Sequence, residues 1–394
     1  MTMKVLQTIP YMLAEHGGPS TCTCDLMDGL YDVGAKVDLL SSRPLNESQK
    51  VVGLGRPWMK TVRCDYKTPL ALSKHTDAFL RSTDYDLYHA NTLWLYPTHA
   101  TCSYARKMNR PYVLSPHGML YPTALAVSRW KKWVMGALWF MKDVMRATCL
   151  HATCVQEMEH CRSFGYKGPI AVIPNAVVFP KCIERTQGSF AFHEGKRVIG
   201  FLGRLHPIKK VEQVLYALDL LRQENVVYTR QICFQIMGKY DDAYEQWLKE
   251  EVKRLKLESC VEFVGFVSGQ EKYNRLSQLS LLMVPSAQEN FDMIVSEALI
   301  CGTPVYASLG TPWNELNECR AGWWRDNRIE IIAGVIKEML ALSDDELFEM
   351  GCRGRLLMKE KYEQHKVAEM MKRLYEWIVI GKMEKGSRPE FVYE

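Results

Sequence analysis

Residues 284–305 read VPSAQENFDMIVSEALICGTPV, and this stretch decides the fold class. An apolar strand ends at Pro285, a polar loop follows, and a helix is expected from about Asp292 to Cys301. The Gly-Thr-Pro after it is suited to end that helix and to begin the next strand. Strand, loop, helix and strand in this order are typical of a parallel sheet covered by helices.

The same rhythm recurs along both halves of the chain. Strands are expected at residues 4–9, 36–41, 86–90, 111–115, 150–155 and 169–173, and again at 197–202, 231–237, 261–264, 279–284 and 304–307. A polar stretch at 181–196 interrupts the rhythm and is interpreted as a linker. We therefore predict two doubly wound α/β domains, at 1–180 and 197–362, followed by a helical tail at 363–394.

The composition narrows the class of protein. The 394 residues carry 50 basic and 45 acidic side chains, a balance that does not favour a nucleic-acid binder. The 13 cysteines form no CxxC pair and are expected to be reduced, mostly buried thiols. No long apolar run resembles a signal peptide, and the best apolar stretch, 133–141, is shorter than the roughly 18 residues that span a bilayer. A cytoplasmic protein is expected.

A basic loop follows the first strand of the predicted second domain. Gly203 leaves that strand, and Arg204 and Lys209 stand on the loop before the next helix. Two cations close to a helix N-terminus are suited to bind a diphosphate, Arg as a planar fork and Lys as a point charge. Solvated basic loops are common, so this loop alone leaves both interpretations open.

Residues 284–305 carry two carboxylates that can act together with that basic loop. Glu289 can reach the sugar part of a ligand, and the N–H groups at 290–293 can donate to phosphate or sugar oxygens. Glu297 lies inside the helix and can accept hydrogen bonds from ribose hydroxyls. The structural alternatives are a helix-dipole partner worth roughly 0.3–1 kcal/mol for Glu289 and a helix-surface carboxylate for Glu297.

Five segments in order resemble the motifs of glycosyltransferase family 4. They are His-Gly-Gly-Pro at 16–19, Ser-Pro-His-Gly at 115–118, Ile-Pro-Asn-Ala-Val at 173–177, Gly-Arg-Leu-x-Pro-x-Lys at 203–209, and the two glutamates separated by seven residues before Ala-Leu-x-Cys-Gly-Thr-Pro-Val. The resemblance covers nearly the whole chain. It implies the GT-B architecture, in which two Rossmann-like domains face each other across a cleft, together with retention of anomeric configuration and no required metal.

The resemblance also implies a set of site residues. The catalytic set is His117, Arg204, Lys209 and Glu289, and the donor-binding set is Gly17, Gly18, Gly203, Asn290, Phe291, Asp292, Met293 and Glu297. In the family picture the two cations neutralise the donor diphosphate, the first glutamate holds the transferred sugar and the second binds the ribose. His117 then sits beside the reacting sugar, whereas a lone histidine would be interpreted as a satisfied buried one. No cofactor and no metal ion are implied.

The chain departs from the family pattern at several positions, among them Asn175-Ala176-Val177, which lacks the more common Gly and following Asp. Asn290 and Asp292 stand where the family usually has glycine, and Lys210 replaces the glycine after the phosphate-loop lysine. Asp292 adds a carboxylate near the expected sugar site, so the identity of the donor sugar cannot be inferred from well-known family members.

The resemblance predicts a retaining, metal-independent hexosyltransferase that uses a nucleotide-sugar donor. Its expected acceptor is a glycan or lipid-linked glycan of cell-surface polysaccharide biosynthesis. The alternatives are a nucleotide-sugar epimerase or hydrolase on the same fold, and a non-catalytic protein that binds sugar nucleotides.

Two further sequence features lie outside the predicted donor site. Asp84-Tyr85-Asp86 matches a DxD metal motif but precedes its strand, so we interpret it as structural. The basic, Trp-rich helix expected at 128–146 is interpreted as packed on the first domain. Peripheral contact of that helix with the inner membrane surface is the alternative.

Overall fold

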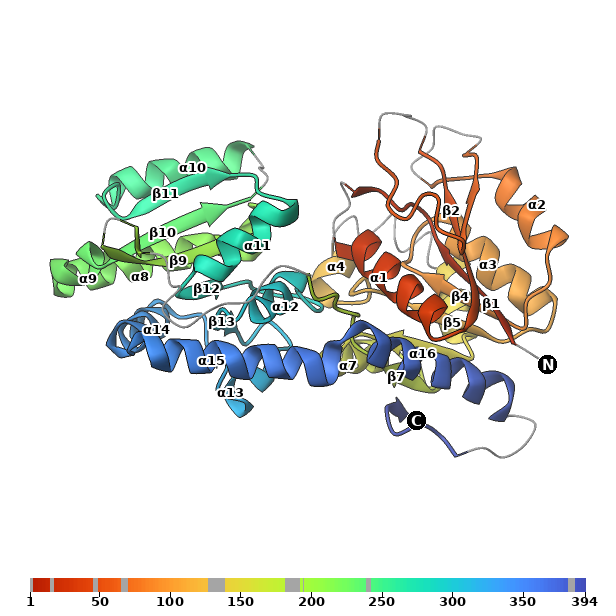
Figure 1. The fold of residues 1–394 in the computed structure, drawn as a ribbon. Coiled ribbons are helices and arrows are strands. Elements are labelled where there is room, and N and C mark those ends of the chain that lie inside the picture. Colours follow the sequence, from red (N-terminus) through yellow and green to blue (C-terminus); the bar gives the residue numbers. More distant parts are fainter. Residues whose placement is uncertain are drawn as a thin grey trace. The chain divides into compact units, whose positions relative to one another are not determined.

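The computed structural model describes residues 3–14, 18–44, 49–64, 70–126, 139–180, 192–193, 195–238, 242–381 and 387–394. The chain divides into two compact units (Figure 1). Unit 1 consists of Met1–Val178 and Tyr362–Glu394, and unit 2 of Phe179–Lys361. Each unit is built on a mainly parallel sheet with helices, so the predicted α/β class is confirmed.

The sheet of unit 1 has the strand order β15-β7-β6-β5-β4-β1-β2-β3 within the described residues. Its strands are β1 (Lys4–Ile9), β2 (Lys36–Ser42), β3 (Met59–Val62), β4 (Leu87–Asn91), β5 (Tyr112–Ser115), β6 (Cys149–Ala152), β7 (Ile170–Val172) and β15 (Val392–Tyr393). Only β15 is antiparallel to its neighbour among these strands. The order reverses between β1 and β4, and ligands of such sheets bind beyond the carboxyl ends of the strands at this reversal.

Helices cover both faces of this sheet. They are α1 (Gly18–Asp32), α2 (Lys74–Ser82), α3 (Tyr96–Lys107), α4 (Pro122–Ala126), α6 (Met141–Met145), α7 (Val155–Ser163) and α16 (Gln364–Val379). The C-terminal helix α16 packs beside α1 in one hydrophobic core, as the red and blue helices of Figure 1 show. A Cβ atom on Gly29 would lie 2.9 Å from Cγ of Gln364, so only glycine permits this close approach.

Unit 2 repeats the plan with the strand order β11-β10-β9-β12-β13-β14, and β8 pairs with β9 off this path. Its strands are β8 (Phe192–His193), β9 (Lys196–Leu202), β10 (Ile232–Met237), β11 (Val261–Gly265), β12 (Leu281–Val284), β13 (Val305–Ser308) and β14 (Gly322–Arg325). Its helices are η3 (Pro207–Lys209), α8 (Val211–Glu224), α9 (Val226–Arg230), α10 (Asp242–Arg254), α11 (Gly269–Gln278), α12 (Met293–Ile300), α13 (Glu315–Glu318), α14 (Ile329–Ala341), α15 (Asp344–Leu357) and η4 (Met358–Tyr362). The reversal of strand order falls between β9 and β12, which carry the predicted motifs.

Local expectations fail at element ends and at sheet edges. The strand expected to reach Val155 stops at Ala152, because Cys154 caps α7 and accepts a hydrogen bond from the Glu157 N–H. The edge strands β3, β14 and β15 were not predicted, since a short edge strand lacks a long apolar run. Of the helix predicted at 128–146, residues 128–138 lie outside the described part, and α6 forms most of the described remainder at 139–146.

Candidate functional site

The predicted phosphate loop is a tight turn at the carboxyl end of β9. η3 forms its centre, and the His206 side chain caps it by accepting a hydrogen bond from the Ile208 N–H at 3.2 Å. Lys210 then adopts a left-handed conformation, with φ of 54°, and leads into α8. Arg204 is exposed, whereas the Lys209 side chain turns inward and is only 15% exposed.

Lys209 lies between two carboxylates. Its Nζ atom is 2.8 Å from Oε1 of Glu289 and 3.3 Å from Oδ2 of Asp292. All three side chains are largely buried. The structure thus brings together three of the predicted site residues from two loops of unit 2.

Burial makes this cluster electrostatically unusual. Burial and the neighbouring Asp292 carboxylate raise the pKa of Glu289 to about 7, against the lowering effect of Lys209. Burial acts to lower the pKa of Lys209, but the two carboxylates outweigh it and raise that pKa above its ordinary value. One cation is therefore shared by two carboxylates, and Glu289 can hold a proton near neutral pH.

The loop that carries Glu289 is fixed by main-chain hydrogen bonds. The Glu289 N–H donates to the Gly310 carbonyl at 2.9 Å, and the Ala287 N–H donates to the Ile208 carbonyl at 2.8 Å. The second bond ties this loop to the phosphate loop. A Cβ atom on Gly310 would lie 2.2 Å from the Ala287 carbonyl oxygen, so this approach requires glycine.

The start of α12 differs from an ordinary capped helix. Asp292 precedes it in a left-handed conformation, with φ of 60°, and its side chain caps no N–H of the first turn. Phe291 is a packing residue: it is buried against Trp313, whose Nε1–H donates to the Phe291 carbonyl at 2.6 Å. The helix entrance is thus held by packing, while the Asp292 carboxylate faces Lys209.

Glu297 has a partner that the sequence analysis missed. Its Oε1 atom lies 2.6 Å from Nζ of Lys272 on α11. Burial raises the pKa of Glu297, and Lys272 opposes this effect. No local sequence signal relates α11 to α12, because this contact depends on the order of helices on the sheet.

In unit 1, His117 lies directly after β5 with a left-handed backbone, φ of 50°. Its Nε2 atom is 3.1 Å from Oδ1 of Asn91, and burial lowers the pKa of His117 to about 4. The next residue is held as well, because the Gly118 N–H donates to Oε1 of Glu157. Glu157 is buried and also accepts the Thr153 N–H at 2.7 Å, so it joins the loops after β5 and β6.

The glycine loop after β1 is only partly described. His16 and Gly17 lie outside the described residues, and Gly18 is the first residue of α1. A Cβ atom on Gly18 would meet nothing within 4 Å in the described structure. Ser20 and Thr21 of the same segment lie inside the helix.

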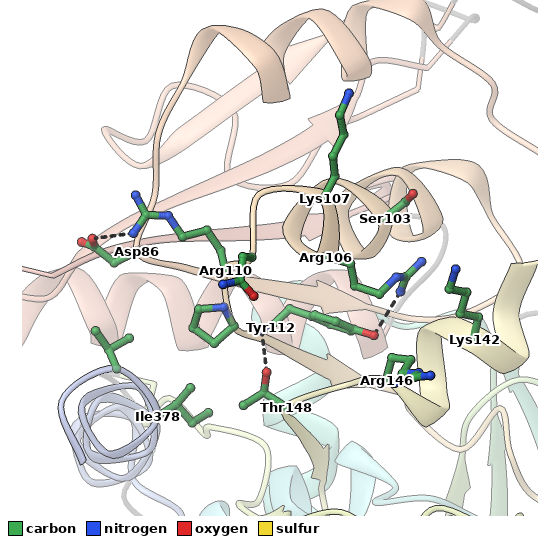
Figure 2. Close-up of a pocket in the computed structure, with 13 residues that line it drawn as sticks. Asp86, Ser103, Arg106, Lys107, Arg110, Tyr112, Lys142, Arg146, Thr148 and Ile378 are labelled. Carbon is green, nitrogen blue, oxygen red and sulfur yellow. Dashed lines mark hydrogen bonds and ion pairs between the residues drawn. The ribbon is translucent and has the colours of Figure 1, made fainter. Parts of the chain in front are cut away.

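A basic pocket of about 1060 Å³ lies at the opposite, amino-terminal edge of the unit 1 sheet (Figure 2). Its cationic side chains are Arg106, Lys107, Arg110, Lys142 and Arg146. Arg110 reaches both carboxylates of the DxD segment, 3.0 Å from Asp84 and 3.9 Å from Asp86. Within the described ranges, no three His, Cys, Asp or Glu side chains gather as a metal site would require.

The family models that match the chain identify the class of protein as glycosyltransferases of the GT-B fold. Residues 17–176 match the family described as glycosyl transferase 4-like domain, and residues 183–347 match glycosyl transferases group 1. These matches cover most of the chain, which belongs to the group 1 glycosyltransferases of the GT-B fold.

The relatives and solved structures agree with that assignment. D-inositol 3-phosphate glycosyltransferase of Stackebrandtia nassauensis is 28% identical over 114 residues, 28% of this chain. The match spans about a quarter of that relative's length, namely 26%. Sucrose-phosphate synthase of Thermosynechococcus elongatus is 18% identical with a TM-score of 0.73, and the Anabaena protein HepE, solved with UDP and glucose, is 16% identical with a TM-score of 0.69. Each structural match covers 95% of this chain and 99% of the other, and at these identities it shows the fold.

Proposed function

We propose that this chain is a retaining glycosyltransferase that moves a hexose from a nucleotide sugar to a hydroxyl of a glycan or lipid-linked glycan. The cluster of Lys209, Glu289 and Asp292 carries the proposal, because it joins a buried cation to a proton-holding carboxyl, and the exposed Arg204 lies on the same loop as Lys209. A sugar diphosphate offers both the anionic charge and the hydroxyls that such a set can bind.

The chemistry that suits these residues is a same-face displacement. The bond from the anomeric carbon to the diphosphate oxygen breaks, and the acceptor oxygen forms a new bond on the same face. The acceptor proton passes to the departing phosphate oxygen. Arg204 and Lys209 stabilise the charge that grows on the diphosphate, and we propose that they do so without a metal ion.

Further roles follow from the same proposal. Glu289 and the N–H groups at Asn290–Met293 hold hydroxyls of the transferred sugar, and Glu297 binds the ribose. Gly203 and the glycines 17 and 18 allow the backbone to approach the donor. His117 contacts the transferred sugar.

A thermal-shift screen against UDP-, GDP-, ADP- and CMP-sugars in the presence of EDTA tests the proposal. A ligand at 100 times its dissociation constant stabilises a protein by about 2.7 kcal/mol. We expect one nucleotide class to stabilise the protein, and Arg204→Ala to abolish that shift. No shift with any donor would contradict a preformed donor site, and a shift lost in EDTA would contradict metal independence.

Product analysis separates the proposed reaction from its alternatives. A transferase consumes the donor only when an acceptor is present, and the product keeps the anomeric configuration of the donor. An epimerase or hydrolase would consume the donor alone. A protein that binds the donor but does not consume it with any acceptor would be a non-catalytic member.

We also propose that unit 1 contacts the inner membrane surface, where a lipid-linked acceptor of cell-surface polysaccharide biosynthesis would be available. The basic pocket of Figure 2 supports this proposal, because Lys142 and Arg146 on and after α6 add to its positive charge. Among the described residues, no helix has both the length and the apolar character needed to cross a bilayer. Sedimentation with anionic but not neutral vesicles, weakened in Lys142→Glu, is the expected result.

A further inference from the structure

A buried polar network runs through unit 1 beneath His117. It joins side chains of β1, β4, β5, β6 and α16, all within this unit. Gln7, His89 and Tyr375 have no exposed surface. Buried polar groups must be hydrogen-bonded, so the direction of each bond can be worked out from groups that can only donate or only accept.

The first fixed point is the main-chain carbonyl of Thr8. The Asn91 amide nitrogen lies 3.4 Å from this oxygen and 3.1 Å from Oε1 of Gln7. Because a carbonyl oxygen only accepts, the nitrogen side of the Asn91 amide must face Thr8. The amide oxygen of Asn91 then faces His117, and it can only accept. Nε2 of His117 must therefore carry a proton.

The second fixed point is the Ile173 carbonyl at the other end of the network. It lies 2.8 Å from Nε2 of His151, so that nitrogen donates. Burial lowers the pKa of His151 to about 4, so its Nδ1 is an unprotonated acceptor for the Ser115 hydroxyl at 2.7 Å. The Ser115 oxygen in turn accepts from Nε2 of His89 at 2.6 Å.

The two deductions meet at Tyr375 on the C-terminal helix. Burial keeps the pKa of His89 well below its ordinary value, so its Nδ1 accepts from the Tyr375 hydroxyl at 2.7 Å. The Tyr375 oxygen then accepts from Nε2 of Gln7 at 2.9 Å. This leaves Oε1 of Gln7 facing Asn91, as the first deduction requires. Two independent carbonyls thus give one direction, with every donor pointing from His117 toward Ile173.

We propose that this directed chain, through Asn91, Gln7 and Tyr375, fixes neutral His117 with its proton on Nε2 and its Nδ1 as a hydrogen-bond acceptor. Asn91 is then a positioning residue for His117, and Tyr375 is a positioning residue for His89 further along the same chain. The consequence for the site rests on the proposed function: Nδ1 accepts from a hydroxyl of the transferred sugar. A phosphate oxygen has no proton to donate and is disfavoured there, so the chain makes His117 select a hydroxyl.

The tautomer can be observed directly in the full-length protein. Labelling with ¹⁵N-histidine gives ring proton–nitrogen correlations for the 10 histidines, and His→Gln variants assign those of His117 and His89. We expect His117 to be protonated on Nε2 alone. Asn91→Leu removes the acceptor and should produce a mixture of the two tautomers at His117.

Tyr375→Phe removes a single buried oxygen and tests the chain in a variant that keeps its shape. We expect the His89 resonances to change strongly and those of His117 to change less, since the Thr8 carbonyl still orients Asn91. Tyr112→Phe is the matched control, because the Tyr112 hydroxyl is also buried in unit 1 and donates to the Asp143 carbonyl outside the chain. It should leave the resonances of both histidines unchanged.

A proton on Nδ1 of His117 in the unaltered protein, or unchanged His89 resonances in Tyr375→Phe, would overturn the inference. In transfer assays, Asn91→Leu should lower kcat/KM by about threefold to tenfold, the effect of one hydrogen bond, and Tyr112→Phe should not. The spectra do not depend on activity. An inactive protein with the expected tautomer would reject the proposed function alone, and an active one with the opposite tautomer would reject this inference alone.

Discussion

Nζ of Lys209 lies 2.8 Å from Oε1 of Glu289, and the same nitrogen lies 3.3 Å from Oδ2 of Asp292. A single buried cation therefore holds two loops of unit 2 together. Burial and the neighbouring Asp292 carboxylate raise the pKa of Glu289 to about 7, although Lys209 acts to lower it. The charge of the cluster is therefore set by two carboxylates that share one cation.

Removing the shared cation should cost activity far more than removing a surface lysine. Lys209→Ala is expected to lower turnover roughly 10²–10³-fold, the usual effect of losing one preorganised charge stabiliser. Lys337→Ala is the matched control, because Lys337 pairs with Glu224 on the surface of the same unit. Steady-state kinetics with the donor found by thermal shift measure both. An unchanged rate in Lys209→Ala would reject its assigned role.

Replacing Asp292 by glycine should weaken the dependence of protein stability on pH. A carboxyl whose folded pKa is about 7, above its ordinary value of 4.5, makes the folded state bind more protons than the unfolded state between those pH values. Stability then falls as pH rises through this window, by at most about 1.4 kcal/mol per unit. In Asp292→Gly, Lys209 pairs with Glu289 alone and the raising effect of Asp292 on the Glu289 pKa is lost. The fall in stability with rising pH should therefore become shallower.

Urea unfolding at pH 5, 6, 7 and 8 measures this slope in the parent protein and in Asp292→Gly. Glu289→Gln removes the titrating group and should also reduce the slope. The double variant should then add little to Glu289→Gln, since the two residues act on one titration. An Asp292→Gly slope equal to that of the parent protein would show that Asp292 does not raise the pKa of Glu289.

A left-handed lysine should be replaceable by glycine with a gain in stability. Lys210 has φ of 54° and ψ of 37°, a conformation that is unfavourable for a residue with a side chain. Lys210→Gly is expected to raise the free energy of unfolding by about 0.5–1 kcal/mol after allowing for the flexibility of glycine in the unfolded chain. Lys256→Gly, at the same φ of 54°, is the control outside the site. Urea denaturation measures both, and a loss of stability in Lys210→Gly would contradict the strain argument.

The opposite substitution should be damaging at Gly310. A Cβ atom there would lie 2.2 Å from the Ala287 carbonyl oxygen, and backbone must move to admit it. Gly310→Ala is expected to lose about 1–3 kcal/mol of stability and to weaken donor binding, because the Gly310 carbonyl holds the Glu289 N–H. Gly334→Ala on α14 meets nothing within 4 Å and should stabilise by about 0.5–1 kcal/mol. Equal melting temperatures for the two variants would contradict the packing argument.

Some residues of the candidate donor site in unit 2 could be predicted from the sequence around them, and others could not. Arg204, Lys209 and Glu289 were predicted from loops beside helix starts, and the structure places two of them in contact. Lys272 was missed, because its pairing with Glu297 depends on two helices that meet only after the sheet forms. Helix entrances can be recognised locally, whereas partners across elements cannot.

The same division applies to unit 1. His117 was predicted from its Ser-Pro-His-Gly context, but its supporting residues were not. Gln7, His89 and Asn91 were available as polar residues inside otherwise buried strands, which is the signal that could have found them. Tyr375 gave no such signal, since its ring belongs to the apolar face of α16.

Local sequence patterns were sufficient to predict the α/β class, the order of strands and helices and the positions of the candidate site loops, because side-chain periodicity and Gly or Pro breaks act over a few residues. Tertiary structure alone decided that Lys209 would serve two carboxylates and that Tyr375 would reach His89, 286 positions away. Such contacts depend on strand order and on the return of the C-terminal helix to the first sheet. Both are set by packing of the whole unit, so no local pattern encodes them.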